Sequence, residues 1–216
     1  ASLKGIEDFI NLEHLEIKFQ NIDSVDLSHN SQLFYVHLRD DNLTSINIGY
    51  LPNLEFLMID ENQISEINLT GAPMLRLFAS QFNQLISLDV SNNIWLFSVY
   101  CWDNQITSLN LSNNILLDYL NCENNALSEL DIRNGHNNQM IEFKVLGNND
   151  LYCINVDDST WSYNNWTFIN DNIDPWHYFS NNCPLPTSIE EHTVKRELIK
   201  TINILGKVTK RPNQML

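Results

Sequence analysis

Four cysteines are the most reactive side chains of this 216-residue sequence, and their positions suggest two different roles. Cys101 and Cys122 occupy equivalent positions 21 residues apart, where the surrounding pattern elsewhere has Leu or Ile, so we expect two buried free thiols that act as small apolar side chains. Cys153 and Cys183 bracket an aromatic-rich segment, and a disulfide between them would stabilise the fold by roughly 3 to 4 kcal/mol. Such a bond requires an exported protein, and the alternative is two unpaired thiols in the cytosol.

The histidines and carboxylates form no recognisable catalytic or metal-binding motif. The six histidines lack the spacing of a zinc site. His14 and His37 could approach each other beside Glu16, although a solvated surface pair is the simpler interpretation. Asp157 and Asp158 could contribute to a calcium site, but a turn is favoured. With no nucleophile motif and no glycine-rich phosphate loop, the sequence predicts a non-enzymatic protein without cofactor or metal.

Charge is distributed unevenly along the chain. Residues 1–183 contain 24 acidic and six basic residues, a net charge of −18, whereas residues 184–216 have a net charge of +3. The acidic part repels phosphate groups, so nucleic acids and anionic membrane surfaces are poor candidate partners. No apolar stretch approaches the roughly 18 to 20 residues that a membrane span needs.

A repeat with a fixed period organises most of the chain. The framework L-x-x-L-x-L-x-x-N-x-L recurs every 21 residues, and a last copy follows a two-residue insertion. The seven copies begin at Leu12, Leu33, Leu54, Leu75, Leu96, Leu117 and Met140. Such a period predicts a solenoid in which each repeat is one coil that is stabilised by its neighbours.

Within each repeat, the residue types indicate which side chains point inward. Alternation around Leu57 and Ile59 predicts a short strand with one buried face, and neighbouring strands would pair in parallel. The turn after each strand has a mostly amide column that can satisfy buried backbone groups: Gln20, Asp41, Asn62, Asn83, Asn104, Asn125 and Asn148. A second polar column predicts tight turns on the convex side: Asp26, Asn47, Asn68, Asp89, Asn110 and Asp131.

These features resemble bacterial extracellular leucine-rich repeats of the 21-residue kind, with repeat endings such as SLDVSNN and SLNLSNN. The resemblance implies an α/β-type repeat solenoid over residues 1–158, with a parallel β-sheet on the concave face and a convex side of turns and short extended segments. It also implies a secreted or cell-surface protein.

Both ends of the repeat array differ from its middle. Residues 151–183 break the period and bring Trp161, Trp166, Trp176 and Phe179 together, which predicts a C-terminal cap. At the other end, Leu3 and Ile6 could complete a partial coil. Residues 184–216, with the segment ELIKTINILGK, resemble the start of the C-terminal sorting domain of bacterial type IX secretion, although they stop soon after this motif.

The variable positions of the framework indicate a binding surface. Its third, fifth, seventh and eighth residues should face the concave side, and in the central repeats they are unusually aromatic and apolar. Contiguous exposed aromatic side chains with charged neighbours are typical of an interaction surface. The candidate ligand-binding residues are Tyr35, Phe56, Met58, Leu77, Phe82, Tyr100, Trp102, Asp103, Tyr119 and Asn121.

Three interpretations of this surface remain open. The aromatic side chains could bind a protein or peptide, which we favour. They could instead stack on sugar rings in a glycan-binding adhesin, whose centre would be Tyr100, Trp102, Asp103, Tyr119 and Asn121. The third is a structural spacer in which cross-strand aromatic pairs only stabilise the sheet, each by roughly 0.2 to 1 kcal/mol.

Overall fold

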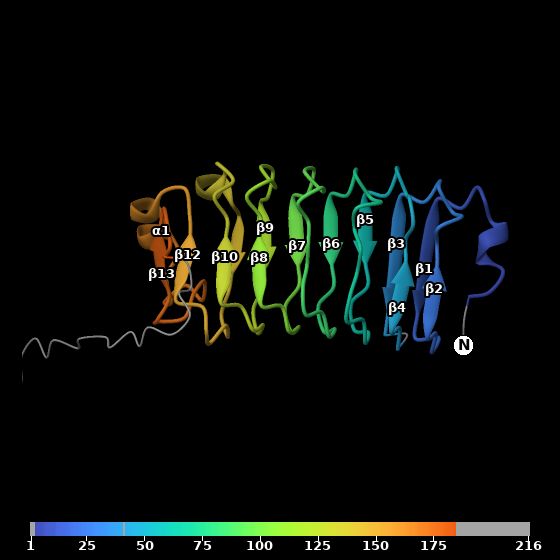
Figure 1. The fold of residues 1–216 in the computed structure, drawn as a ribbon, viewed down its shortest axis with the longest axis horizontal. Coiled ribbons are helices and arrows are strands. Elements are labelled where there is room, and N and C mark those ends of the chain that lie inside the picture. Colours follow the sequence, from blue (N-terminus) through green and yellow to red (C-terminus); the bar gives the residue numbers. More distant parts are fainter. Residues whose placement is uncertain (1–2, 41, 185–216) are drawn as a thin grey trace, which may run out of the picture. The chain divides into compact units, whose positions relative to one another are not determined.

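The computed structural model describes residues 3–40 and 42–184 (Figure 1). Residues 1–183 form one compact unit, a parallel-strand solenoid whose coils follow one another in sequence order. The resemblance of the tail to a sorting domain concerns residues beyond Pro184, so it lies outside the described residues.

One face of the solenoid is a seven-stranded parallel sheet, with one strand from each predicted repeat. Most paired residues are 21 apart, as Phe56 and Leu77 are, whereas Tyr119 pairs with Glu142 because of the two-residue insertion. The strands are β1 (His14–Lys18), β3 (Tyr35–Arg39), β5 (Phe56–Met58), β6 (Leu77–Ala79), β7 (Ser98–Tyr100), β9 (Tyr119–Asn121) and β11 (Glu142–Lys144). The predicted fold class is confirmed.

The opposite side of each coil consists of turns and short strands. Two strands pair near the amino end, β2 (Ser24–Asp26) and β4 (Ser45–Asn47). Four pair near the carboxyl end: β8 (Ser108–Asn110), β10 (Glu129–Asp131), β12 (Cys153–Asn155) and β13 (Tyr178–Ser180).

The predicted tight turns of this side are present in all six repeats. The backbone N–H two residues after each Asp or Asn donates to its side-chain oxygen, at 2.9 Å for Ser28 onto Asp26 and for Ser91 onto Asp89. Hydrogen bonds from these two serines lower the pKa of both carboxyls.

The interior is a column of fully buried aliphatic side chains bordered by asparagines. Nδ2 of Asn62 donates to the carbonyl of Leu38 in the preceding coil at 2.8 Å, and its Oδ1 accepts from the Leu43 N–H at 3.0 Å. The same arrangement recurs at Asn83, Asn104, Asn125 and Asn148. The predicted ladder is therefore confirmed from Asn62 onward, while Gln20 is exposed and Asp41 lies outside the described residues.

A second set of buried asparagines was not anticipated. Asn93 donates to the carbonyls of Leu69 and Ala72 at 3.1 and 2.8 Å, and Asn114 donates to the two equivalent carbonyls of the next coil. Asn30 performs the same role against the partial first coil. The column is difficult to recognise in the sequence because Leu51 and Ala72 interrupt it.

Short helical segments close or interrupt the array. The 3₁₀ helix η1 (Ile6–Asp8) precedes the first full coil, and Leu3 and Ile6 pack against the core, as predicted for a partial coil. The 3₁₀ helix η2 (Asn137–Gln139) occupies the insertion before β11.

Residues 151–183, which we call the cap, contain β12, the helix α1 (Ser159–Asn165) and β13. The indole of Trp166 stacks on the Phe143 ring at 4.1 Å, and Trp161 and Phe179 contact it at 5.3 and 5.8 Å. Trp176 differs from the prediction, because it is 42% exposed and its ring contacts His177. A disulfide joins Cys153 to Cys183, as predicted.

Candidate binding face

We use the name sheet face for the outward-facing side of the seven-stranded sheet together with the seventh and eighth framework residues, which follow the strand in most repeats. It contains all ten candidate ligand-binding residues. Most of their side chains are half-buried against one another, and Phe82 is 49% exposed. The ring contacts divide the aromatic residues into two clusters.

The amino-terminal cluster spans β1, β3 and β5. The rings of His14 and Tyr35 are stacked with centroids 4.1 Å apart, and Tyr35 contacts Phe56 at 6.2 Å. His14 therefore contacts an aromatic neighbour rather than His37, which lies nearer to Asp60.

Charged side chains next to this cluster form ion pairs with one another. Asp60 is buried, and its carboxylate lies 3.4 Å from Nε2 of His37 and 3.3 Å from Nε of Arg39. Arg39 also forms an ion pair with Glu61. Burial and the charge of Lys18 lower the pKa of His37 despite the attraction of Asp60, so this imidazole is mainly neutral at pH 7.

The carboxyl-terminal cluster is centred on Trp102. Its indole contacts the Phe82 ring at 6.3 Å and the Tyr100 ring at 5.8 Å, both edge-on. Burial and the charge of Glu142 raise the pKa of Tyr100, so its hydroxyl remains a hydrogen-bond donor at neutral pH.

The remaining candidates connect or flank the two clusters. Met58 and Leu77 are half-buried between them, and Tyr119 pairs in register with Ser98 and Glu142. Both polar ends of the Asn121 amide are bonded to Glu123, through Nδ2 to the carboxylate at 2.9 Å and through Oδ1 to the N–H at 3.1 Å.

A regular backbone feature of the sheet face was not predicted. The eighth framework residue has a positive φ in all seven repeats, between 52° and 74°: Phe19, Asp40, Glu61, Phe82, Asp103, Asn124 and Gly147. Gly, Asn and Asp tolerate this left-handed conformation, whereas a bulky residue such as Phe rarely adopts it. This conformation is difficult to recognise in the sequence because only one of the seven repeats has Gly at the eighth position.

A second exposed apolar group was also missed. It lies in the segments that lead into the strands of successive coils, where earlier coils have the polar residues Gln32 and Asn53. Its members are Met74, Ile94, Trp95, Ile115 and Leu116. Their spacing of 21 residues is visible in the sequence, but these positions lie outside the four framework columns that should face the concave side.

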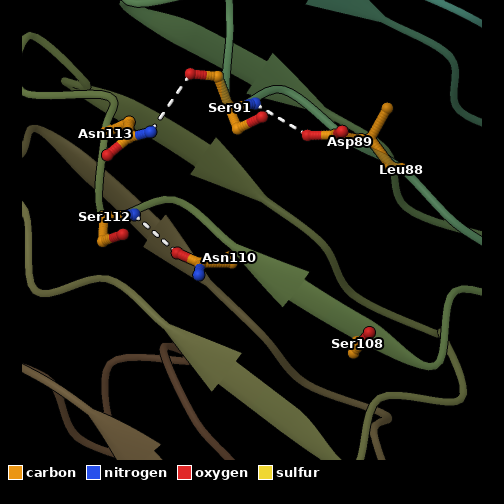
Figure 2. A pocket seen from close by; sticks show the side chains of 7 residues that line it. All are labelled: Leu88, Asp89, Ser91, Ser108, Asn110, Ser112 and Asn113. Carbon is orange, nitrogen blue, oxygen red and sulfur yellow. Dashed lines mark hydrogen bonds between the residues drawn. The ribbon is translucent and has the colours of Figure 1, made fainter.

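A shallow hollow of about 260 Å³ lies on the opposite side, among the turns around β8 (Figure 2). Its polar groups already form bonds within and between turns, such as the 3.2 Å bond from Asn113 Nδ2 to the Ser91 carbonyl (Figure 2). This hollow is therefore explained by turn geometry.

The 21-residue framework and the one parallel strand that each coil adds to the sheet define the fold class. The chain has a leucine-rich-repeat fold. It is similar to internalin C2 of Listeria monocytogenes, with 21% identity, a TM-score of 0.49, and 72% and 76% of the two chains covered. It is also similar to internalin F of that organism, with 16% identity, a TM-score of 0.36 and 72% of each chain covered.

The functional domain of InlJ, also from Listeria monocytogenes and described as having a cysteine ladder, matches with 21% identity and a TM-score of 0.34. The match covers 72% of this chain and 55% of that one, so the present chain spans about half of the InlJ domain. A scan of protein-family models and a search of curated proteins each gave no match.

Other candidate chemical groups of this leucine-rich-repeat chain have structural roles. Asp158 caps α1 by accepting from the N–H groups of Thr160 and Trp161, and Asp157 accepts from Gly135 N–H at 3.0 Å. Within residues 3–40 and 42–184, no three His, Cys, Asp or Glu side chains are grouped as a metal site would require. No helix in that part of the chain is long and apolar enough to cross a membrane.

Proposed function

We propose that this protein is a non-enzymatic interaction module that binds a protein or peptide on the sheet face. The observation that supports this most strongly is the cluster of Phe82, Tyr100 and Trp102, in which a half-exposed phenylalanine adjoins a half-buried tryptophan. Aromatic anchors of this kind provide much of the binding energy at protein interfaces. The leucine-rich-repeat fold is consistent with such a role.

The position of Phe82 argues against a role limited to stabilising the sheet. Cross-strand pairs join residues that lie opposite each other, as Tyr35 and Phe56 do. Phe82 lies beyond the end of β6, with a φ of 56°, and contacts a residue of a different framework column. The fold does not require Phe at this position, because Asp103 and Asn124 adopt the same conformation in the next two coils. The conformational cost of Phe82 therefore points to a role other than folding.

We further propose that the protein acts outside the cytosol, at the cell surface or in a secreted form. The Cys153–Cys183 disulfide supports this setting, since such bonds persist in oxidising compartments.

Selection of random peptides displayed on phage, using the full chain as bait, tests the proposed binding. Selected peptides should bind the wild-type protein and lose at least tenfold in affinity with Trp102→Ala. They should be unaffected by Trp176→Ala, which removes an indole that is 42% exposed from the cap.

The proposal is contradicted if both variants reduce binding equally or if no peptide is selected. A glycan array run in parallel addresses the adhesin alternative. Trp102-dependent binding of glycans without any peptide binding would also contradict the proposal.

A further inference from the structure

The carboxyl ends of the central strands form a distinct part of the sheet face. We call it the acceptor rim and define it by the seventh and eighth framework residues of three coils: Gln81, Phe82, Trp102, Asp103, Glu123 and Asn124. It combines aromatic rings, amides and carboxylates, and it contains no cationic side chain.

Charge pairing differs between the rim and the coils before it. In the preceding coils, Asp60 and Glu61 both form ion pairs with Arg39, and His37 is also close to Asp60. Within the described residues, the carboxylates of Asp103 and Glu123 have no such cationic partner.

The strands beside the rim do not supply a matching positive charge. Lys144 of β11, which pairs in register with Asn121, is the nearest cation in the sheet, and its single positive charge does not balance the two rim carboxylates. The rim therefore retains a net negative charge from Asp103 and Glu123 next to the half-exposed Phe82 and the indole of Trp102.

Gln81 provides an independent indication of a ligand that donates hydrogen bonds. Its Oε1 atom is buried and accepts no hydrogen bond from the described residues. A buried acceptor without a donor is unfavourable, and a rotation of the Gln81 side chain toward the surface would let a donor supplied by a ligand remove this cost. Gln81 directly precedes Phe82 and occupies the same framework position as Trp102 in the next coil, so it belongs to the acceptor rim.

We propose that the acceptor rim recognises a cationic side chain, Arg or Lys, in a basic segment of the peptide or protein ligand. The cation would lie against the indole of Trp102, because Trp attracts cations more strongly than Tyr or Phe does. The carboxylates of Asp103 and Glu123 neutralise its charge, and Gln81 accepts one of its N–H groups. This inference rests on the proposed function and specifies the chemistry of its ligand.

Because the chain is acidic as a whole, the test must separate a local site from general attraction between opposite charges. The probe is a fluorescein-labelled heptapeptide of Arg, with heptapeptides of Ser and of Glu for comparison, followed by fluorescence anisotropy at physiological ionic strength.

Matched variants then locate the binding. Asp103→Asn removes a charge from the rim, and Asp171→Asn removes one from an exposed position in the cap with an almost identical φ, 53° against 54°. Trp102→Ala and Trp176→Ala form the second pair. We expect the two rim variants to weaken binding of the Arg peptide at least fivefold and the two cap variants less than twofold.

Equal effects of the rim and cap variants would overturn the inference, as would binding of the Ser peptide as tight as that of the Arg peptide. The phage selection distinguishes this failure from failure of the proposed function. Trp102-dependent peptides without enrichment in Arg or Lys would overturn the inference while leaving the proposed function intact. Unchanged urea-unfolding midpoints of all four variants exclude misfolding as the cause of lost binding, and Phe82→Asn provides a second rim variant if Trp102→Ala is unstable.

Discussion

At the residue scale, Phe82 has a left-handed backbone and a large side chain that is 49% exposed. Phe82→Asn should relieve a backbone cost of about 1 kcal/mol and lose a ring contact with Trp102 worth about as much. We therefore expect the free energy of unfolding, measured with urea, to change by less than about 1 kcal/mol, while ligand binding weakens.

The control is Phe78→Ala, which truncates a fully buried phenylalanine of the preceding strand and should cost about 3 to 5 kcal/mol. A loss of more than about 2 kcal/mol in Phe82→Asn would show that Phe82 is primarily structural.

The four cysteines should differ sharply in reactivity. Cys101 and Cys122 are buried free thiols, and burial raises the pKa of Cys101 to about 12. Iodoacetamide at pH 8 should label neither in the native protein. It should label only these two after denaturation without reductant, and Cys153 and Cys183 only after reduction. Mass spectrometry of the peptides checks this pattern, and native labelling of Cys101 would contradict its burial.

Residue identities predicted the cysteine roles well, because burial of Cys at an inward framework position follows from the repeat. They could not predict the charge pairing of Asp60. That pairing depends on which side chains of two neighbouring coils turn toward each other, and a single repeat does not contain this information.

At the element scale, the asparagine ladder links each coil to the one before it. Asn83 donates to the carbonyls of Ile59 and Ser80 at 2.9 and 3.0 Å and accepts from the Ile64 N–H at 2.9 Å. Asn83→Ala leaves these buried groups unpaired, so we expect a loss of about 2 to 4 kcal/mol in the free energy of unfolding. The exposed Asn92→Ala should change it by less than about 0.5 kcal/mol. Similar losses in both variants would contradict the role of the ladder.

The cap should be sensitive to acid through His177. Burial lowers the pKa of this imidazole, whose Nε2 lies 3.3 Å from the Asn148 carbonyl. The ordinary value in an unfolded chain is about 6.5, so the unfolded state binds the proton first as the pH falls. Stability from His177 is therefore complete above about pH 6.5 and is lost as the pH falls through the lowered pKa.

The urea-unfolding midpoint should fall more between pH 7.5 and pH 5.5 in the wild type than in His177→Gln. The comparison uses the change with pH, because the substitution itself lowers stability at both values. Equal changes in the two proteins would show that His177 does not contribute to the acid sensitivity.

The strands, the turns and the first ladder could be predicted from the sequence because their residues recur with a period of 21. The second set of asparagines and the left-handed eighth column were harder to foresee. In both columns several residue types occur, so the backbone conformation or hydrogen-bond pattern repeats from coil to coil while the residue type does not. Trp176 was misplaced because aromatic content alone does not show which side chains of a non-repetitive segment turn inward.

At the scale of the whole molecule, the coils have interchangeable interiors and individual surfaces. Core positions repeat Leu, Ile or Val, whereas the sheet face changes from paired charges around Asp60 to aromatic residues and unpaired carboxylates around Trp102. Such a gradient along the repeats would let the protein hold an extended ligand in one direction, with its cationic part at the acceptor rim.

Hydroxyl-radical footprinting of the full chain, with and without a selected peptide, tests the sheet-face proposal most directly, because Met, Trp, Tyr and Phe side chains are oxidised where they are accessible. We predict that the peptide protects Met58, Phe82, Tyr100 and Trp102 and leaves Tyr163 and Trp176 unchanged. Protection limited to the cap or to the opposite side of the coils, with Trp102 oxidised as in the free protein, would contradict the account.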